Sequence, residues 1–237
     1  MPPTDPPPAI ETNLPAPSTK WPVFSISTHI VIDARPSAVW NALLDFPAYS
    51  AWNPFVSSQV VTTNDGKWIP LDDQTPKEGL GLVMHVHIPP LPSPLGFTNQ
   101  NAEENGKKIL KHQMSYETIT AVDEAHLRVA WKQAFLPKWL LDAERWQALT
   151  VVPAISEPDA AAGGEAGTGE ELGQQDGQSR TYRGERTYYE TRAVFSGPLA
   201  YVVRMLYAKG LQEGFEAHAR ALKGLVEASE RRAGGKA

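Results

Sequence analysis

The sequence contains no cysteine among its 237 residues. That absence excludes a disulfide-stabilised secreted scaffold, a thiolate metal site, an iron–sulfur cluster and catalysis by a cysteine nucleophile. Positive charge is also scarce, because 22 Lys and Arg residues face 27 Asp and Glu residues and give a formal net charge of -5. The whole chain therefore has no bulk basic field to attract nucleic acid or anionic lipid.

Long apolar runs and common catalytic motifs are missing too. No run approaches the roughly 18 apolar residues that a membrane-spanning helix needs, so we expect no integral membrane segment. The sequence has no phosphate-binding Gly-rich motif before a helix, no nucleophile elbow and no HExxH. We therefore predict no cofactor and no metal site. Nucleic acid is not an expected partner, because the aromatic residues do not alternate with Lys and Arg.

Proline and glycine are abundant but unevenly distributed. Residues 1–20 are rich in proline and poor in large apolar side chains, which predicts a disordered arm. Residues 153–180 are rich in Gly, Ala, Glu and Gln and are interpreted as a flexible insertion in a hairpin connection. Residues 232–237 are expected to form a frayed tail. The remaining chain, 21–231, is expected to be one domain. Residues 1–20 lack the basic and apolar regions of a signal peptide, so we expect a cytoplasmic protein.

Hydrophobic periodicity predicts an antiparallel sheet and one long helix. Pro36 begins a short helix that Phe46-Pro47 ends, and a second short helix covers 49–52. Gly197-Pro198 precedes an amphipathic helix that runs to about Ser229. Alternation of apolar and polar residues predicts strands over 24–32, 58–62, 80–88, 108–122, 126–135, 145–152 and 182–195. About seven antiparallel strands with one long helix predict an α+β fold.

Two segments carry a family resemblance. VIDARPSAVWNALLDFPAYSAWNPFV (31–56) and FSGPLAYVVRMLYAKGLQEGFEAHARALKGLVE (195–227) resemble the START-like superfamily, also called SRPBCC, over roughly residues 23 to 230. That superfamily includes polyketide cyclase/dehydrase-type proteins and lipid-transfer domains. The resemblance implies the helix-grip fold, in which a curved sheet wraps around the long C-terminal helix and encloses a hydrophobic cavity.

The apolar parity of each strand is expected to face that helix and its cavity. This parity predicts a ligand-binding set of Met84, Met114, Tyr116, Trp131, Gln133, Thr191 and Phe195 from the strands, with Leu211 and Phe215 from the helix. Glu117, Glu190 and Arg192 fall on the opposite parity and are expected to form charge pairs on the outer face.

Three residues are candidate proton carriers: His112, Tyr189 and His218. His112 is the strand histidine on an apolar parity, and His218 lies on the apolar stripe of the long helix. For each, the alternative is a buried residue satisfied by neighbouring backbone groups. Gly210 and Gly214 likewise have two interpretations: they leave room for a ligand, or they allow the helix to pack closely on the sheet.

The predicted function is the binding of a hydrophobic small molecule, such as a polyketide, lipid, sterol or aromatic metabolite. Two versions remain open. One is a cofactor-independent enzyme of the polyketide cyclase/dehydratase or isomerase type, in which a cavity residue moves a proton. The other is a non-catalytic carrier or sensor, which needs no titratable group inside. The sequence leaves the oligomeric state open.

Overall fold

The computed structural model describes residues 10–19, 21–91, 113–152 and 185–234. Seven strands, two α-helices and one 3-10 helix lie in these ranges. In chain order they are β1 (Phe24–Ile32), α1 (Pro36–Leu44), η1 (Phe46–Ala51), β2 (Val56–Thr62), β3 (Gly81–Val86), β4 (Gln113–Asp123), β5 (Arg128–Gln133), β6 (Asp142–Val152), β7 (Arg186–Ser196) and α2 (Leu199–Gly234).

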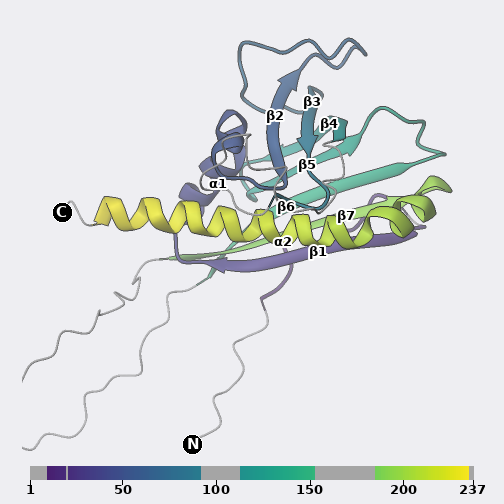
Figure 1. The fold of residues 1–237 in the computed structure, drawn as a ribbon. Helices are drawn as coiled ribbons and strands as arrows, with labels where there is room; N and C mark the ends of the chain where they lie inside the picture. The colour runs from purple at the N-terminus through teal and green to yellow at the C-terminus, as the bar shows by residue number, and fades with distance from the viewer. Residues whose placement is uncertain (1–9, 20, 92–112, 153–184, 235–237) are drawn as a thin grey trace, which may run out of the picture.

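The strands form one antiparallel sheet in the order β1-β7-β6-β5-β4-β3-β2. Figure 1 shows α2 lying along β1 and β7, with α1 packed near its C-terminal half. Although β7 is the last strand in the sequence, it lies between β1 and β6 in the sheet. The first and last strands are therefore neighbours in the part of the sheet that α2 covers. The predicted α+β helix-grip architecture is confirmed. No helix in the described ranges is long and apolar enough to cross a membrane.

The start of α2 depends on one glycine. Gly197 follows β7 with a φ of 88°, a backbone conformation that favours glycine. A Cβ at this position would lie 2.6 Å from the carbonyl oxygen of Leu140, so a larger residue would collide with the β5–β6 loop. The backbone N–H of Leu199 donates to the same Leu140 oxygen at 3.0 Å. This close approach fixes the beginning of α2 beside the beginning of β6.

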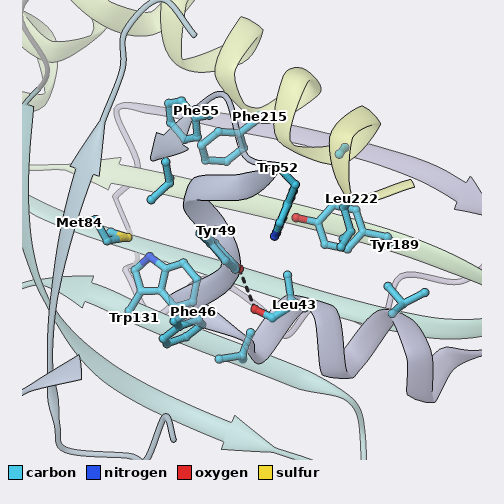
Figure 2. Close-up of a cluster of buried hydrophobic side chains, with 14 of the residues drawn as sticks. Leu43, Phe46, Tyr49, Trp52, Phe55, Met84, Trp131, Tyr189, Phe215 and Leu222 are labelled. Carbon is cyan, nitrogen blue, oxygen red and sulfur yellow. Dashed lines mark hydrogen bonds between the residues drawn. The ribbon is translucent and has the colours of Figure 1, made fainter. Parts of the chain in front are cut away.

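The core lies between the concave face of the sheet and the helices. Figure 2 shows aromatic side chains from η1 and α2 meeting those of the sheet, and the Tyr49 hydroxyl donates to the Leu43 carbonyl oxygen at 2.7 Å. Phe46 packs edge-on against both Tyr49 and Trp131, with ring centroids 5.7 and 6.3 Å apart. These contacts hold α1 and η1 against the sheet near the C-terminal half of α2.

The predicted disordered arm and frayed tail each need a correction. Residues 10–19 lie on the outer face of the sheet, where Thr12 donates to the Glu190 carboxylate at 2.7 Å and Asn13 Nδ2 donates to the Leu149 carbonyl oxygen at 2.8 Å. Buried carboxylates of the sheet therefore give this proline-rich segment polar anchors that its composition does not reveal. Residues 232–234 are helical and belong to α2. The predicted insertion at 153–180 lies outside the described residues.

The glycines of α2 provide a stability test. A Cβ at Gly214 would lie 2.2 Å from the ring of Phe55, whereas a Cβ at Gly224 would meet nothing within 4 Å. Alanine improves helix propensity at either position by about 1 kcal/mol, but overpacking a core costs about 1–3 kcal/mol. We expect Gly214→Ala to lower the free energy of unfolding and Gly224→Ala to raise it, as measured by urea denaturation. Equal stabilisation by both would contradict the close packing.

Candidate functional site

A cavity of about 170 Å³ lies between α2 and the concave face of the sheet, on the side of β3, β4 and the first half of β6. Figure 2 shows Phe55 and Phe215 together beside α2, with Met84 and Trp131 on the sheet side. The wall is formed by Phe55, Val56, Met84, Val86, Ile88, Gln113, Met114, Ser115, Glu117, Trp131, Ala143, Glu144, Arg145, Ala193, Phe195, Leu211 and Phe215. The lining is mostly apolar and contains two buried charge-bearing side chains, Arg145 and Glu117, that reach it from the inner face.

Arg145 brings a buried cation to the cavity. Arg145 is 8% exposed, and its cross-strand neighbours are the inward-facing Trp131 and Ala193. The guanidinium carbon lies 4.2 Å from the ring centroid of Phe215, and Nε donates to Thr191 Oγ1 at 3.2 Å. No carboxylate among the described residues forms an ion pair with it. Nη2 also donates to Gln147 Oε1 across a long 3.5 Å. Aromatic faces thus stabilise the cation, and the remaining donors are available for a ligand.

Glu117 is the second charge-bearing group of the cavity. It pairs across the sheet with Leu82 on β3, whose side chain is fully buried, so both side chains point inward. Ser115 Oγ donates to its carboxylate at 2.5 Å. Burial raises the pKa of Glu117 to about 7, against the opposing effects of the Ser115 hydrogen bond and the Arg145 charge. The carboxyl can therefore both hold and release a proton near neutral pH.

The predicted parity of β4 is wrong. Tyr116 points to the outer face, where its ring lies 5.3 Å from that of Trp68 and 5.8 Å from that of Phe135. Large apolar residues occupy both faces of this strand, and its pairing with β5 shifts between Ile119 and Ala121. The prediction took the face that carries Met114 and Tyr116 as the inner one, although it is the outer face. Glu117, on the opposite parity, was therefore predicted to lie outside. The burial of Glu117 depends on its cross-strand pairing with Leu82, and the sequence alone does not reveal this pairing.

The remaining predicted ligand-binding residues divide into two groups. Five of them line the cavity: Met84, Trp131, Phe195, Leu211 and Phe215. Met114 also borders the cavity, with half of its surface exposed.

Thr191 and Gln133 do not line the cavity. The Thr191 hydroxyl accepts from Arg145 Nε and donates to the Trp146 carbonyl oxygen at 2.8 Å, so it positions the arginine. The Gln133 amide donates to the carbonyl oxygens of Leu136 and Leu141 and anchors the β5–β6 loop. Both side chains bond to protein groups and do not line the cavity.

His218 and Tyr189 lie in the packed core behind the cavity. Asn53 Oδ1 accepts from the backbone N–H of Phe55 and of Val56, so its amide group is the donor toward His218 Nδ1, 2.8 Å away. Burial, followed by the Arg145 charge, holds the pKa of His218 well below its usual value, and the ring is neutral. This neutral histidine fixes the segment between η1 and β2 onto α2.

The other two predicted proton carriers are placed as follows. The Tyr189 hydroxyl donates to Gln147 Oε1 at 2.6 Å, and burial raises the pKa of Tyr189 to about 12, so it stays protonated. His112 lies outside the described residues. The only titratable side chains that reach the cavity wall from the inner face, among the residues described, are thus Glu117 and Arg145, and the sequence reasoning selected neither.

A second, wider depression of about 390 Å³ lies on the outer face, between residues 11–13 and the β4–β5 turn. Two of its polar side chains are already engaged, since Asn13 Oδ1 accepts from Arg128 Nε at 2.9 Å and the Thr12 hydroxyl is bonded to Glu190. This groove is the seam beside the docked segment. The inner cavity is the better candidate site.

Residues 23–76 match the family model described as polyketide cyclase / dehydrase and lipid transport. The match covers β1, α1, η1 and β2, which support one end of the cavity, and it agrees with the family resemblance of residues 31–56. It is consistent with a fold that binds hydrophobic ligands.

Solved structures with a similar fold have low sequence identity. A START superfamily protein from Mycobacterium smegmatis is 14% identical, covers 86% of this chain and 97% of its own, and has a TM-score of 0.45. The Zhui aromatase/cyclase from Streptomyces sp. R1128 is 15% identical; the match covers 89% of this chain and 98% of the cyclase, with a TM-score of 0.47. Truncated norcoclaurine synthase from Thalictrum flavum is 13% identical; the match covers 86% of this chain and 92% of the synthase, with a TM-score of 0.45. No curated protein matches the sequence.

The buried carboxyl of Glu117 predicts a pH-dependent stability. Its pKa is raised from 4.5 to about 7 on folding. Its contribution to the free energy of unfolding is therefore fully present below about pH 4.5 and is lost as the pH rises through about 7. Replacing Glu117 by glutamine removes the cost of ionising this group inside the protein. We expect Glu117→Gln to be more stable than the parent at pH 8 by about 2–3 kcal/mol, with little difference at pH 4.5.

Urea denaturation at the two pH values measures this effect. Glu78→Gln, on the exposed loop before β3, is the matched control and should leave the pH dependence unchanged. A Glu117→Gln difference that does not grow between pH 4.5 and 8 would contradict the raised pKa.

Proposed function

We propose that the protein binds a hydrophobic small molecule in this cavity, with an oxygen acceptor of the ligand held by Arg145. The observation that carries the proposal is the buried guanidinium at an apolar wall without a carboxylate partner among the described residues. An isolated buried cation is costly. A carbonyl, enol or carboxylate oxygen would satisfy the donors of Arg145 and would distinguish an oxygenated ligand from a plain hydrocarbon.

The apolar wall supplies the affinity. Phe55, Phe215 and Trp131 offer aromatic faces for a flat ligand, and burial of apolar surface contributes roughly 25 cal/mol per Å². The cavity, at about 170 Å³, is smaller than the roughly 300–1,000 Å³ of sites for drug-sized ligands. This size favours a compact aromatic or polyketide-like molecule of one or two rings over a sterol or a lipid with two acyl chains.

A matched pair of ligands tests the role of Arg145. We expect 2-naphthol and 2-naphthoate both to bind and to quench the fluorescence of the buried Trp131, because both present the same rings. Arg145→Met should weaken 2-naphthoate by at least about tenfold more than 2-naphthol, since a bond to a charged group is worth about 1.5–3 kcal/mol. An Arg145→Met variant that binds 2-naphthoate as tightly as the parent does would contradict the proposed contact.

A cavity-filling pair tests the location of the site. Leu211 lines the cavity, whereas Leu225 on the same helix is 39% exposed. Leu211→Trp should abolish the binding of both naphthalene ligands, and Leu225→Trp should leave it unchanged. Binding that survives Leu211→Trp, in a variant with an unchanged circular dichroism spectrum, would place the ligand elsewhere.

A second candidate function, acid–base catalysis on the bound ligand, is favoured by Glu117. Its carboxyl lines the same cavity as Arg145, is buried, and has a pKa of about 7. Glu117 in its ionised form would remove a proton from the carbon beside a ligand carbonyl, and Arg145 would stabilise the resulting enolate oxygen. The returned proton completes the exchange without a cofactor. This is the proton movement that a cyclase or dehydratase requires, whereas a carrier needs no such group.

Solvent exchange separates the enzyme from the carrier. With 2-tetralone in deuterium oxide, we expect the protein to accelerate deuterium incorporation beside the carbonyl, as followed by proton NMR. Glu117→Gln should reduce the acceleration by about 10²–10⁴-fold, the usual contribution of a general base, while 2-naphthol binding is retained. Glu78→Gln should exchange like the parent. Binding without any exchange in the parent protein would support a carrier and reject the catalytic candidate.

A further inference from the structure

The N-terminal end of α2 exposes an unusual amount of apolar surface. Six of the eleven large apolar side chains that are exposed in the described ranges belong to residues 135–139 and 201–206. In the first turns of α2 the exposed positions are Tyr201, Val202, Met205 and Leu206, which recur at helical spacing and form one stripe. The opposite side of the same turns is apolar as well and packs inward. These first turns therefore have a second apolar face, which no described element covers.

The β5–β6 loop extends this surface with a tryptophan. Trp139 is 74% exposed, and the next residue, Leu140, is bonded to the first residue of α2 through the 3.0 Å contact with the Leu199 N–H. Figure 1 shows the start of α2 at the end of the sheet where β6 begins. We call Trp139, Tyr201, Val202, Met205 and Leu206 the apolar end. A contiguous exposed apolar surface is a sign of an interaction site.

Two cations that form no ion pair among the described residues border the apolar end. The loop segment 134–141 contains Lys138 and no acidic residue, and residues 197–208 contain Arg204 and no acidic residue. Both cations are exposed, whereas Lys209, further along α2, forms an ion pair with Glu213 at 4.0 Å. The net charge of the whole chain is -5, so this end is basic against the trend of the molecule. The absence of a bulk basic field does not exclude a local one.

We propose that the apolar end docks on an anionic lipid surface. Trp139 and Tyr201 are amphipathic aromatic side chains, which favour the boundary between headgroups and acyl chains. Met205 and Leu206 would enter the acyl region, while Lys138 and Arg204 would meet the lipid phosphates. A second copy of the chain is a poorer occupant, because a two-fold interface would bring these cations opposite one another.

The apolar end lies next to the cavity. Tyr207, one residue beyond it on α2, accepts a hydrogen bond from Gln113 Nε2 at 3.1 Å, and Gln113 lines the cavity. Leu211, one turn further along α2, lines the cavity as well. Docking would therefore hold this side of the cavity close to the lipid surface. The docking itself does not depend on what the cavity binds.

Vesicle co-sedimentation of the full chain tests the proposal. We expect binding to mixed phosphatidylcholine–phosphatidylglycerol vesicles, weaker binding to phosphatidylcholine alone, and a decrease with salt. Met205→Glu should lower the partition coefficient on mixed vesicles by at least about tenfold, because it removes an inserted apolar side chain and adds a repelled charge. Ile69→Glu, at a 53% exposed position on the β2–β3 loop, makes the same charge change and should bind like the parent.

A double variant and a solution measurement complete the test. Lys138→Ser combined with Arg204→Ser should remove most of the preference for phosphatidylglycerol without altering the apolar side chains. Absence of vesicle binding by the parent, or equal loss in Ile69→Glu, overturns the proposal. A dimer in light scattering that Met205→Glu dissociates, with no vesicle binding, also overturns it and identifies a self-association face. Binding of 2-naphthol should be unchanged in every variant, so the outcome is independent of the proposed cavity function.

Discussion

One long helix has to cover the concave face of a seven-stranded sheet, and a single helix is too narrow to fill it. At one end, Tyr49 of η1 and Trp52, the residue after η1, fill the remaining space. They pack around His218 of α2, with ring centroids 6.0 and 5.3 Å away. At the other end no described element adds such a layer, and a cavity of about 170 Å³ remains between α2 and strands β3, β4 and β6. The same helix exposes apolar residues at its N-terminal end, beside that cavity.

Polar groups inside the fold follow the same division. In the filled part, Asn53 bonds to His218 and Tyr189 bonds to Gln147, which gives these four side chains a structural role, although His218 Nε2 and Trp52 Nε1 are buried without a hydrogen-bond partner in the described part of the chain. At the cavity, Arg145 rests on aromatic rings and Glu117 carries a raised pKa. Buried charge without a complete protein partner is characteristic of functional sites, because the missing interactions are those that a ligand would supply.

The residues that carry the candidate site were the hardest to predict. Apolar alternation identified Met84, Trp131 and Phe215 because they belong to the core, and a cavity is bounded by core residues. It assigned Glu117 to the outer face, because β4 carries large apolar residues on both sides. Arg145 begins a predicted strand at 145, whereas β6 starts at Asp142, and an arginine at a strand end carries no signal of burial. Their function depends on cross-strand neighbours that lie far away in the sequence.

The sequence by itself determined the element order, the antiparallel sheet, the long C-terminal helix and its apolar stripe, because periodicity and Gly/Pro positions act within short windows. Only the tertiary structure decided which face of β4 is inside, that Thr12 and Asn13 of the proline-rich segment bind the buried Glu190, and that Arg145 and Glu117 share one cavity. The physical reason is that burial, desolvation and charge pairing arise between segments that chain folding brings together, and local patterns carry no information on those partners.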